Sequence, residues 1–278
     1  MEKIMLVIAG SSPALQATQF ATYLAGMTHS KLIGYFFEYE LYADKPEIKT
    51  ILGFPFVESI VAEDLPELAE KKKTINDHRR KFENTCSEKG IFSSSSYLEW
   101  PVLPTLITDS RFADVIIVDA TFCHLSDKQD ELSSFLQHLL ANAQCPVIIT
   151  PTGFSSMEEV IFLYDSSPSA VFAIKQFCYL FPELDEARAT VVNTNKKTIS
   201  SEEKKQINNW LCRHFGYTDF LDINDENEPV LLDYLLKKQN PIIIMGADKR
   251  SFISRLFRHS YTELMLKTLA YPVFITHH

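Results

Sequence analysis

The sequence predicts two α/β domains in one chain of 278 residues, each with a parallel sheet between layers of helices. Short apolar runs such as DVIIVDA (114–120) and PIIIMGA (241–247) have the composition of strands that are buried on both faces. Segments with helical periodicity alternate with these runs over short connections, which is typical of doubly wound folds. The chain also repeats itself, because PVIIT (146–150) returns at its end as PVFIT (272–276).

The first copy begins with MEKIMLVIAGSS, whose apolar stretch of six residues predicts a buried strand, because it is too short for a signal peptide or a membrane span. A long charged segment, 67–90, carries apolar Ile75 and Phe82 and predicts an outer helix. The predicted strands of this copy are 3–9, 31–37, 96–100, 114–119 and 146–150. Its predicted helices are 13–27, 62–89, 103–110 and 131–143.

The second copy is revealed by VIFLYDSSPSAV (160–171), which matches IMLVIAGSSPAL (4–15) near the start of the chain. These two starts are 155 residues apart, whereas the two PV-x-IT segments are 126 residues apart. The first copy is therefore longer by 155 − 126 = 29 residues. We expect this surplus in an insertion at 38–61, which has no counterpart in the second copy.

Turn-forming residues separate the two copies. The segment TPTGFSSME (150–158) combines proline, glycine and serine, which favours a join between domains. We therefore place domain one at 1–152 and domain two at 156–278. The predicted strands of domain two are 158–164, 188–194, 218–223, 241–246 and 272–276, and its predicted helices are 168–181, 201–215, 228–238 and 260–270.

The composition is that of an ordinary soluble globular protein, with 46% hydrophobic and 23% charged residues. The formal charge of −9 argues against nucleic acid or an anionic membrane as a partner, although a local basic patch can still bind a phosphate. Five scattered cysteines without a CxxC pair indicate reduced thiols and a cytoplasmic protein. Cys145 and Cys178 lie in apolar runs and are expected in the core.

The second copy resembles the universal stress protein family in the order of its elements. Its first strand has Asp165 at the carboxyl end, a later strand ends in Gly246, a helix opens at Ser260, and Pro272 enters the last strand. The resemblance extends over both copies, so the chain looks like a tandem member of the family. It implies for each copy a five-stranded parallel sheet of order 3-2-1-4-5, of the adenine nucleotide alpha hydrolase-like type, with helices on both faces.

The resemblance also implies where a nucleotide would bind. Family members that bind ATP do so at the carboxyl ends of strands 1 and 4, where the strand order reverses. Their phosphate motif is Gly, two residues, Gly, nine residues, Gly, then Ser or Thr. Glycines allow the backbone to approach phosphate, and the helix that follows offers free N–H groups. In domain two, Gly246 holds the first glycine position, Lys249 the second, His259 the third, and Ser260 the hydroxyl position.

Two of the three glycines are thus replaced in domain two. The Lys249 side chain either fills the space of the phosphate oxygens or supplies a cation to them. An alternative is a solvated loop whose charges balance acidic neighbours, and Ser260 with Glu263 forms a capping box that needs no phosphate. Asp165 would meet the adenosine end of the nucleotide. The remaining candidate binding residues are Ser166, Thr194, Arg250 and Tyr261.

Domain one departs further from the family pattern. Gly10 stands where Asp165 stands in domain two, Asp119 takes the first glycine position, and Phe122 lies near the second. Asp127 and Asp130 in the same segment would repel phosphate. We therefore do not expect domain one to bind ATP in the manner of the family.

Two hypotheses about function remain open. In the first, the chain is a cytoplasmic universal stress protein with a regulatory or protective, non-catalytic role, and any adenine nucleotide is held in domain two. In the second, which we favour for ATP itself, neither domain binds ATP and the protein acts through its surfaces, the 38–61 insertion among them. A weak ATPase is least favoured, because no general base or metal-binding pair of carboxylates accompanies the loop. His277 and His278 alone do not make a metal site.

The repeated PV-x-IT segments predict how the domains pair. Proline removes an N–H group at the strand entrance, which an edge strand tolerates. In the family the last strand is an edge, and members commonly dimerise by pairing these edges antiparallel. We expect 146–150 to pair with 272–276 within the chain, forming an intramolecular pseudo-dimer and covering two exposed edges. A further homodimer is left open.

Overall fold

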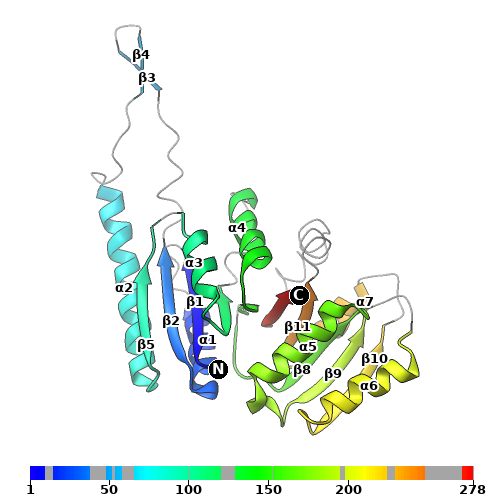
Figure 1. Cartoon of the computed structure of the whole chain (residues 1–278). Helices are drawn as coiled ribbons and strands as arrows, with labels where there is room; N and C mark the ends of the chain where they lie inside the picture. Colours follow the sequence, from blue (N-terminus) through cyan, green and yellow to red (C-terminus); the bar gives the residue numbers. More distant parts are fainter. Residues whose placement is uncertain are drawn as a thin grey trace.

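One mixed sheet of ten strands runs through the described part of the chain (Figure 1). The sheet order is β10-β9-β8-β11-β12-β7-β6-β1-β2-β5, so each half of the chain supplies five neighbouring strands. The structure is a computed structural model, and it describes residues 1–9, 15–37, 48–51, 54–57, 66–99, 101–119, 129–151, 153–194, 198–223, 229–247 and 271–277.

The first half of the chain alternates strands and helices as the sequence predicts. Its strands are β1 (Lys3–Ala9), β2 (Lys31–Phe37), β5 (Ser93–Tyr97), β6 (Val115–Val118) and β7 (Val147–Ile149). Its helices are α1 (Leu15–Thr28), α2 (Pro66–Glu88), α3 (Leu103–Ser110) and α4 (Gln129–Asn142). Within the predicted insertion, β3 (Ile48–Ile51) and β4 (Phe54–Val57) pair antiparallel in a separate two-stranded sheet, which the sequence did not predict.

The second half repeats this order. Its strands are β8 (Glu159–Tyr164), β9 (Arg188–Asn193), β10 (Tyr217–Asp222), β11 (Pro241–Ala247) and β12 (Val273–His277). Its helices are α5 (Pro168–Leu180), the short η4 (Pro182–Leu184), α6 (Ser201–Leu211) and α7 (Pro229–Leu236). Serine side chains start two of these helices, because Ser167 accepts the N–H of Ala170 and Ser200 accepts the N–H of Glu203. The predicted helix at 260–270 lies outside the described residues.

The strand order 3-2-1-4-5 is confirmed in each half, and the two five-stranded sheets are joined at their edges into one mixed sheet. Strands β7 and β12 pair antiparallel, with Val273 opposite Ile149 and Ile275 opposite Val147, and they merge the halves into one sheet. We call this pair of strands the seam. The expected pairing of 146–150 with 272–276 is thereby confirmed. The domain boundaries at 152 and 156 fall in the connection from β7 to β8 and stay a prediction.

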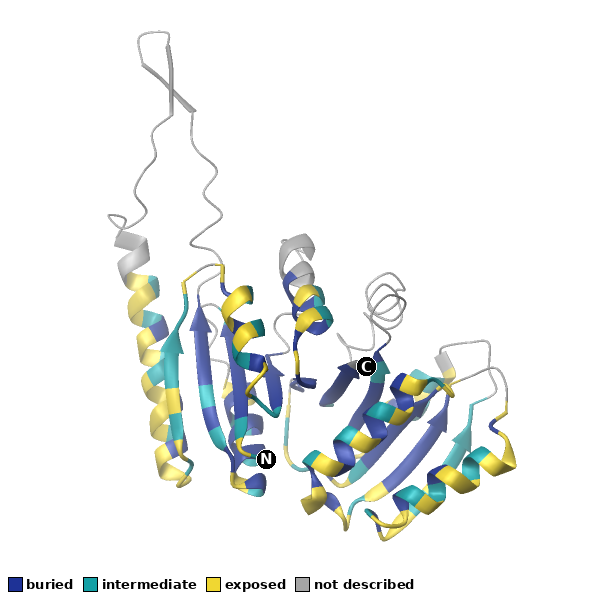
Figure 2. Cartoon of the chain, viewed as in Figure 1, coloured by how far each residue is buried: buried dark blue, intermediate teal, exposed yellow. Residues whose placement is uncertain are grey.

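Two hydrophobic cores lie on opposite faces of the sheet, and each runs through both halves. Helices α1, α2, α5 and α6 cover one face, where the core includes Ile148 and Phe274 from the seam. Helices α3, α4 and α7 cover the other face, where the core includes Ile149 and Val273. Figure 2 shows the inner strands mostly buried, the edge strands β5 and β10 mainly intermediate, and the outer sides of these helices exposed. Neighbouring seam residues therefore point into different cores, as alternation along a strand requires.

Aromatic contacts tie the seam and the connection between the halves to the helices above them. The Phe274 ring lies 5.4 Å from that of Phe177 on α5, edge to face. In the connection after β7, the Phe154 ring lies 5.0 Å from Phe20 and 5.0 Å from Tyr23, both on α1. Such pairs add to the stabilisation from burial alone.

A polar cluster around Asn240 holds the other end of this connection. The Asn240 amide nitrogen donates to the Ser156 hydroxyl (3.1 Å) and to Glu158 (3.0 Å), and its oxygen accepts from the Ser155 hydroxyl (2.9 Å). Asn240 has a φ of 50°, a left-handed conformation that asparagine tolerates better than most residues. The segment joining the halves is therefore fixed to the turn before β11.

Strand β5 is the element whose position the sequence predicted wrongly, at 96–100 instead of Ser93–Tyr97. Its four serines are poor strand formers, but the strand pairs with β2 from Ser93 opposite Leu32 to Tyr97 opposite Phe36. Side chains of α2 secure it, since Arg79 donates to the Ser95 hydroxyl (3.0 Å) and Glu83 accepts from it (2.6 Å). Pairing and helix contacts outweigh propensity here.

Replacing Phe274 with alanine tests the packing over the seam. Phe274 is fully buried among aromatic rings, so Phe274→Ala should lower the free energy of unfolding by about 3 kcal/mol. Urea unfolding followed by circular dichroism measures the change. Phe112 is 78% exposed, and Phe112→Ala should alter stability by less than about 0.5 kcal/mol. Equal losses in the two variants would contradict the described core.

Candidate functional site

The candidate site lies at the carboxyl ends of β8 and β11, where the strand order of the second half reverses. These strands run parallel and side by side, with Leu163 opposite Met245 near their ends. Asp165 follows β8 directly, and Gly246 lies one residue after Met245 on β11. Loops that leave neighbouring parallel strands at such a point diverge and leave a crevice, the usual ligand position in open α/β sheets.

The turn from β8 into α5 is built from Asp165, Ser166 and Ser167. The Asp165 Oδ1 atom accepts the backbone N–H of Ser167 at 3.0 Å, and the Ser167 hydroxyl accepts that of Ala170 at 3.1 Å. Ser166 has a φ of 62°, which few non-glycine residues adopt. The two side chains thus satisfy helix-end donors and hold a tight turn. Asp165 and Ser166 are both exposed at this edge.

Gly246 is required by packing between β11 and α5. A Cβ atom at this position would lie 2.2 Å from the carbonyl carbon and oxygen of Ser169 and 2.5 Å from the nitrogen of Ala170. All three are backbone atoms of the first turn of α5, so no side chain can rotate away to make room. A glycine here therefore allows the helix to approach the strand.

Thr194 completes the predicted residues that the structure brings together. Its N–H donates to the carbonyl oxygen of Tyr164 at 2.8 Å, and its hydroxyl donates to the same oxygen at 3.2 Å. Thr194 is therefore held beside the end of β8, next to Asp165. Five other predicted residues lie outside the described part of the chain: Lys249, Arg250, His259, Ser260 and Tyr261.

A polar network at the same edge was missed by the sequence analysis. The Tyr164 hydroxyl donates to Glu203 on α6 at 2.5 Å. The Asn193 amide donates to Asp222 at 3.0 Å, and the Lys204 ammonium pairs with the same carboxylate. Asn193 is fully buried at the end of an apolar strand. A polar residue that ends the apolar run ATVVN was the one sequence feature that could have indicated this network. The partners come from four different elements, β8, β9, β10 and α6, which no local pattern reveals.

Two pKa shifts follow from this network. Burial, and then the hydrogen bond to Glu203, raise the pKa of Tyr164, so its hydroxyl remains a donor at neutral pH. The hydrogen bond from Lys204, with a second from Asn193, lowers the pKa of Asp222 and keeps its carboxylate charged. The Tyr164 hydroxyl therefore stays neutral and the Asp222 carboxylate stays charged over the physiological pH range.

The corresponding edge of the first half presents a buried carboxylate. Asp119, at the predicted first-glycine position, follows β6 directly, is only 6% exposed, and its N–H donates to the carbonyl oxygen of Val7 at 3.4 Å. Gly10 and Phe122 lie outside the described residues. A carboxylate at this point opposes the approach of a phosphate.

Cysteines, metals and membrane spans add no further site. Cys145 and Cys178 are buried as predicted, and burial raises the pKa of each thiol to about 12, which makes them poor nucleophiles. Among the described residues there is no group of three or more His, Cys, Asp or Glu side chains that could hold a metal ion. Within the same residues, no helix combines the length and the apolar character needed to cross a bilayer.

Comparisons with known proteins identify the fold. No protein-family model and no curated protein sequence matches the chain. A universal stress protein structure from Archaeoglobus fulgidus DSM 4304 is similar over 99% of this chain and 96% of its own, with 13% identity and a TM-score of 0.64. A structure from Pseudomonas aeruginosa UCBPP-PA14, described as a universal stress protein, is similar over 100% of this chain and 93% of its own, with 14% identity and a TM-score of 0.59.

A third similar structure is the cytoplasmic domain of a prokaryotic cation chloride cotransporter. It matches over 99% of this chain and 94% of its own, with 11% identity and a TM-score of 0.55. The chain thus has the fold of full-length universal stress protein structures over both halves. Identities this low establish shared architecture, and function has to be argued from the site.

The packing role of Gly246 predicts a large effect of one methyl group. Gly246→Ala should lower the free energy of unfolding by about 3 kcal/mol, because the Cβ atom meets helix backbone. Gly26, inside α1, has open space around the same position, and Gly26→Ala should leave stability unchanged or raise it by about 0.5 kcal/mol. Thermal and urea unfolding measure both. A neutral Gly246→Ala variant would refute the described contact of β11 with α5.

The Asp222 network predicts a pH dependence of stability. Because the pKa of Asp222 is lowered in the folded chain, its contribution is present above the ordinary value of 3.8 and is lost as pH falls through the folded value. Asp222→Asn should therefore be less stable than the original protein at neutral pH, with a smaller difference at about pH 3.5. Urea unfolding at the two pH values measures this. A difference that grows on acidification would contradict the network.

Proposed function

We propose that this chain is a tandem universal stress protein with a regulatory or protective, non-catalytic role in the cytoplasm. It acts through its surfaces and holds adenine nucleotide at most in its second half. The shared fold over the whole length of known universal stress protein structures supports this proposal, as does the order of the motifs in the second half.

The main support for the proposal is that Gly246 and Asp165, which would bind a nucleotide, already have roles in packing and in turn formation. The space beside Gly246 is taken by the backbone of α5, which leaves a packing reason for the glycine without any phosphate. Asp165 accepts the N–H of Ser167 and so builds its own turn. In the first half, the buried Asp119 stands at the equivalent position.

A non-catalytic role agrees with the bonding at this edge. Ser167 caps a helix and Thr194 bonds to the carbonyl of Tyr164. Hydrolysis of a phosphate ester would need a base or a metal beside the reacting group. Among the described residues of the edge, the hydroxyl groups of Ser167 and Thr194 serve the backbone instead. The fold itself is compatible with many roles, since it also occurs in a domain of a cotransporter.

A second candidate is an ATP-binding stress protein that uses the crevice of the second half. The exposed Asp165 carboxylate at the strand-order reversal favours it, because this is where the resemblance places the adenosine end. In that case Asp165, Gly246 and Ser260 would hold the nucleotide. The two candidates differ in one measurable property, the affinity for ATP.

Equilibrium binding of labelled ATP separates them. We expect no saturable binding by the original protein and a gain of binding in Lys249→Gly, which restores the second glycine of the motif. Asp165→Ala and Asp165→Asn form a matched pair, because asparagine keeps an oxygen for the Ser167 N–H and loses only the charge. Saturable binding by the original protein that disappears in both Asp165 variants would overturn our preference and establish the second candidate.

A further inference from the structure

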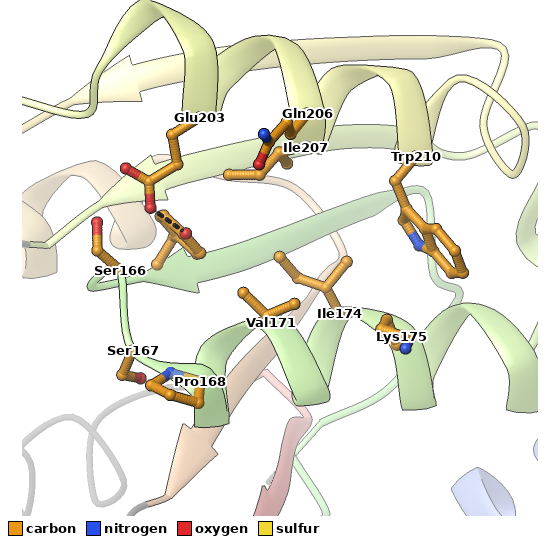
Figure 3. A pocket seen from close by; sticks show the side chains of 11 residues that line it. Ser166, Ser167, Pro168, Val171, Ile174, Lys175, Glu203, Gln206, Ile207 and Trp210 are labelled. Atoms are coloured by element: carbon orange, nitrogen blue, oxygen red, sulfur yellow. Dashed lines mark hydrogen bonds between the residues drawn. The ribbon is translucent and has the colours of Figure 1, made fainter.

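A groove between α5 and α6 adjoins the proposed nucleotide crevice at Ser166 and extends from there between the two helices to Lys175 and Trp210. It has a volume of about 460 Å³, within the range of small-molecule sites. Figure 3 shows α5 on one side and α6 on the other, with the end of β8 between them. The groove lies between the two helices and over the end of β8, and the residues at its far end, Lys175 and Trp210, belong to the helices alone.

The middle of the groove is apolar. Val171 and Ile174 line it from α5 and Ile207 lines it from α6 (Figure 3), and Tyr164 at the end of β8 also belongs to the lining. Ile174, Ile207 and Tyr164 are buried, while Val171 is 41% exposed at the rim. Water in such a channel makes few hydrogen bonds, so displacing it by an apolar group is favourable.

Polar groups converge at one end. The Tyr164 hydroxyl donates to Glu203 there, and Ser166 lines the same end of the groove. A carboxylate has acceptor positions beyond the one that Tyr164 uses. The exposed Asp165 lies beside this end of the groove, since the residues before and after it in the chain both line the groove. At the start of α5, the backbone N–H of Ser167 already donates to Asp165, and that of Ala170 already donates to the Ser167 hydroxyl. This end therefore attracts a hydrogen-bond donor with positive charge.

The opposite end carries an aromatic ring and a cation. The Trp210 ring has the Lys175 ammonium 5.6 Å from its centre, and the ring of His214, in the turn after α6, lies 5.3 Å from it. Lys175 lies eight residues after Ser167, a distance of about 12 Å along α5. Its charge repels a second cation from this end. The groove is therefore polarised, negative at Glu203 and positive at Lys175.

From this arrangement we infer that the α5–α6 groove binds small aromatic amines. The protonated amine donates to Glu203 beside Tyr164, and the ring lies between Val171 and Ile207 toward Trp210. Charge-assisted hydrogen bonding fixes the orientation, and burial of the ring supplies most of the affinity. The inference does not depend on the proposed function, because none of its groups belongs to the phosphate motif.

Phenethylamine is a suitable probe because it carries one ring and one ammonium group. The chain has two tryptophans, so Trp100→Phe leaves Trp210 as the single fluorescent reporter. Titration should change Trp210 fluorescence saturably, with a Kd on the order of 1 mM for a ligand of about nine non-hydrogen atoms. Saturation-transfer NMR of the probe provides a second readout that does not rely on Trp210.

Matched variants test the two contacts that the inference requires, the charged contact at Glu203 and the apolar contact at Val171. Glu203→Gln still accepts from Tyr164 but loses the charge, and it should weaken binding about tenfold. Val171→Trp fills the groove from its exposed rim and should abolish binding in the saturation-transfer readout, which the added tryptophan does not disturb, while far-UV circular dichroism shows the helix content retained. The anion 3-phenylpropionate has the same ring with the opposite charge and should bind at least about tenfold more weakly.

Several results would overturn the inference. They are the absence of saturable change in both readouts, equal affinity in Glu203→Gln, unchanged binding in Val171→Trp, or binding of 3-phenylpropionate as tight as that of phenethylamine. A response to adenosine with none to phenethylamine would also overturn it. Failure of ATP to bind in the separate assay has no bearing on this outcome, so the two proposals fail independently.

Discussion

The antiparallel pairing of β7 with β12 is the interaction on which the rest of the structure depends. Each half of the chain folds as a parallel sheet whose last strand would be an open edge with unpaired backbone groups. Pairing Phe274 opposite Ile148 closes both edges at once and makes a single sheet. Because neighbouring seam residues point to different faces, both hydrophobic cores become continuous across the halves.

The same pairing determines where sites can form. Strand direction reverses at the seam, so the carboxyl end of β7 adjoins the amino end of β12. Each half must therefore build any crevice from its own strands and loops. The halves have done so differently, with a buried Asp119 in one and an exposed Asp165 with a tight turn in the other. The α5–α6 groove of the second half is a further product of this divergence.

Much of this architecture could be predicted from the sequence, and particular residues show why. PVIIT and PVFIT revealed the duplication and the seam, because proline at a strand entrance marks an edge. Uniformly apolar β6 and β11 were predicted within a residue at each end. The serines of β5 caused the strand to be predicted three residues too late, because pairing with β2 and the contacts of Arg79 determine its position and neither is visible in the local sequence. Contacts between residues far apart in the sequence could not be predicted, because no local pattern marks them. The hydrogen bond of Tyr164 with Glu203 and the packing of Gly246 against Ser169 are examples.

The central claim is that the seam makes the two halves one cooperative unit. Native-state hydrogen exchange followed by mass spectrometry measures it most directly, by comparing amides of β7 and β12 with those of β1 and β8 at increasing denaturant. The account predicts that all four strands exchange through one common opening, with the same free energy and the same dependence on denaturant. Exchange of β7 and β12 at a distinctly lower free energy, while β1 and β8 stay protected, would contradict it.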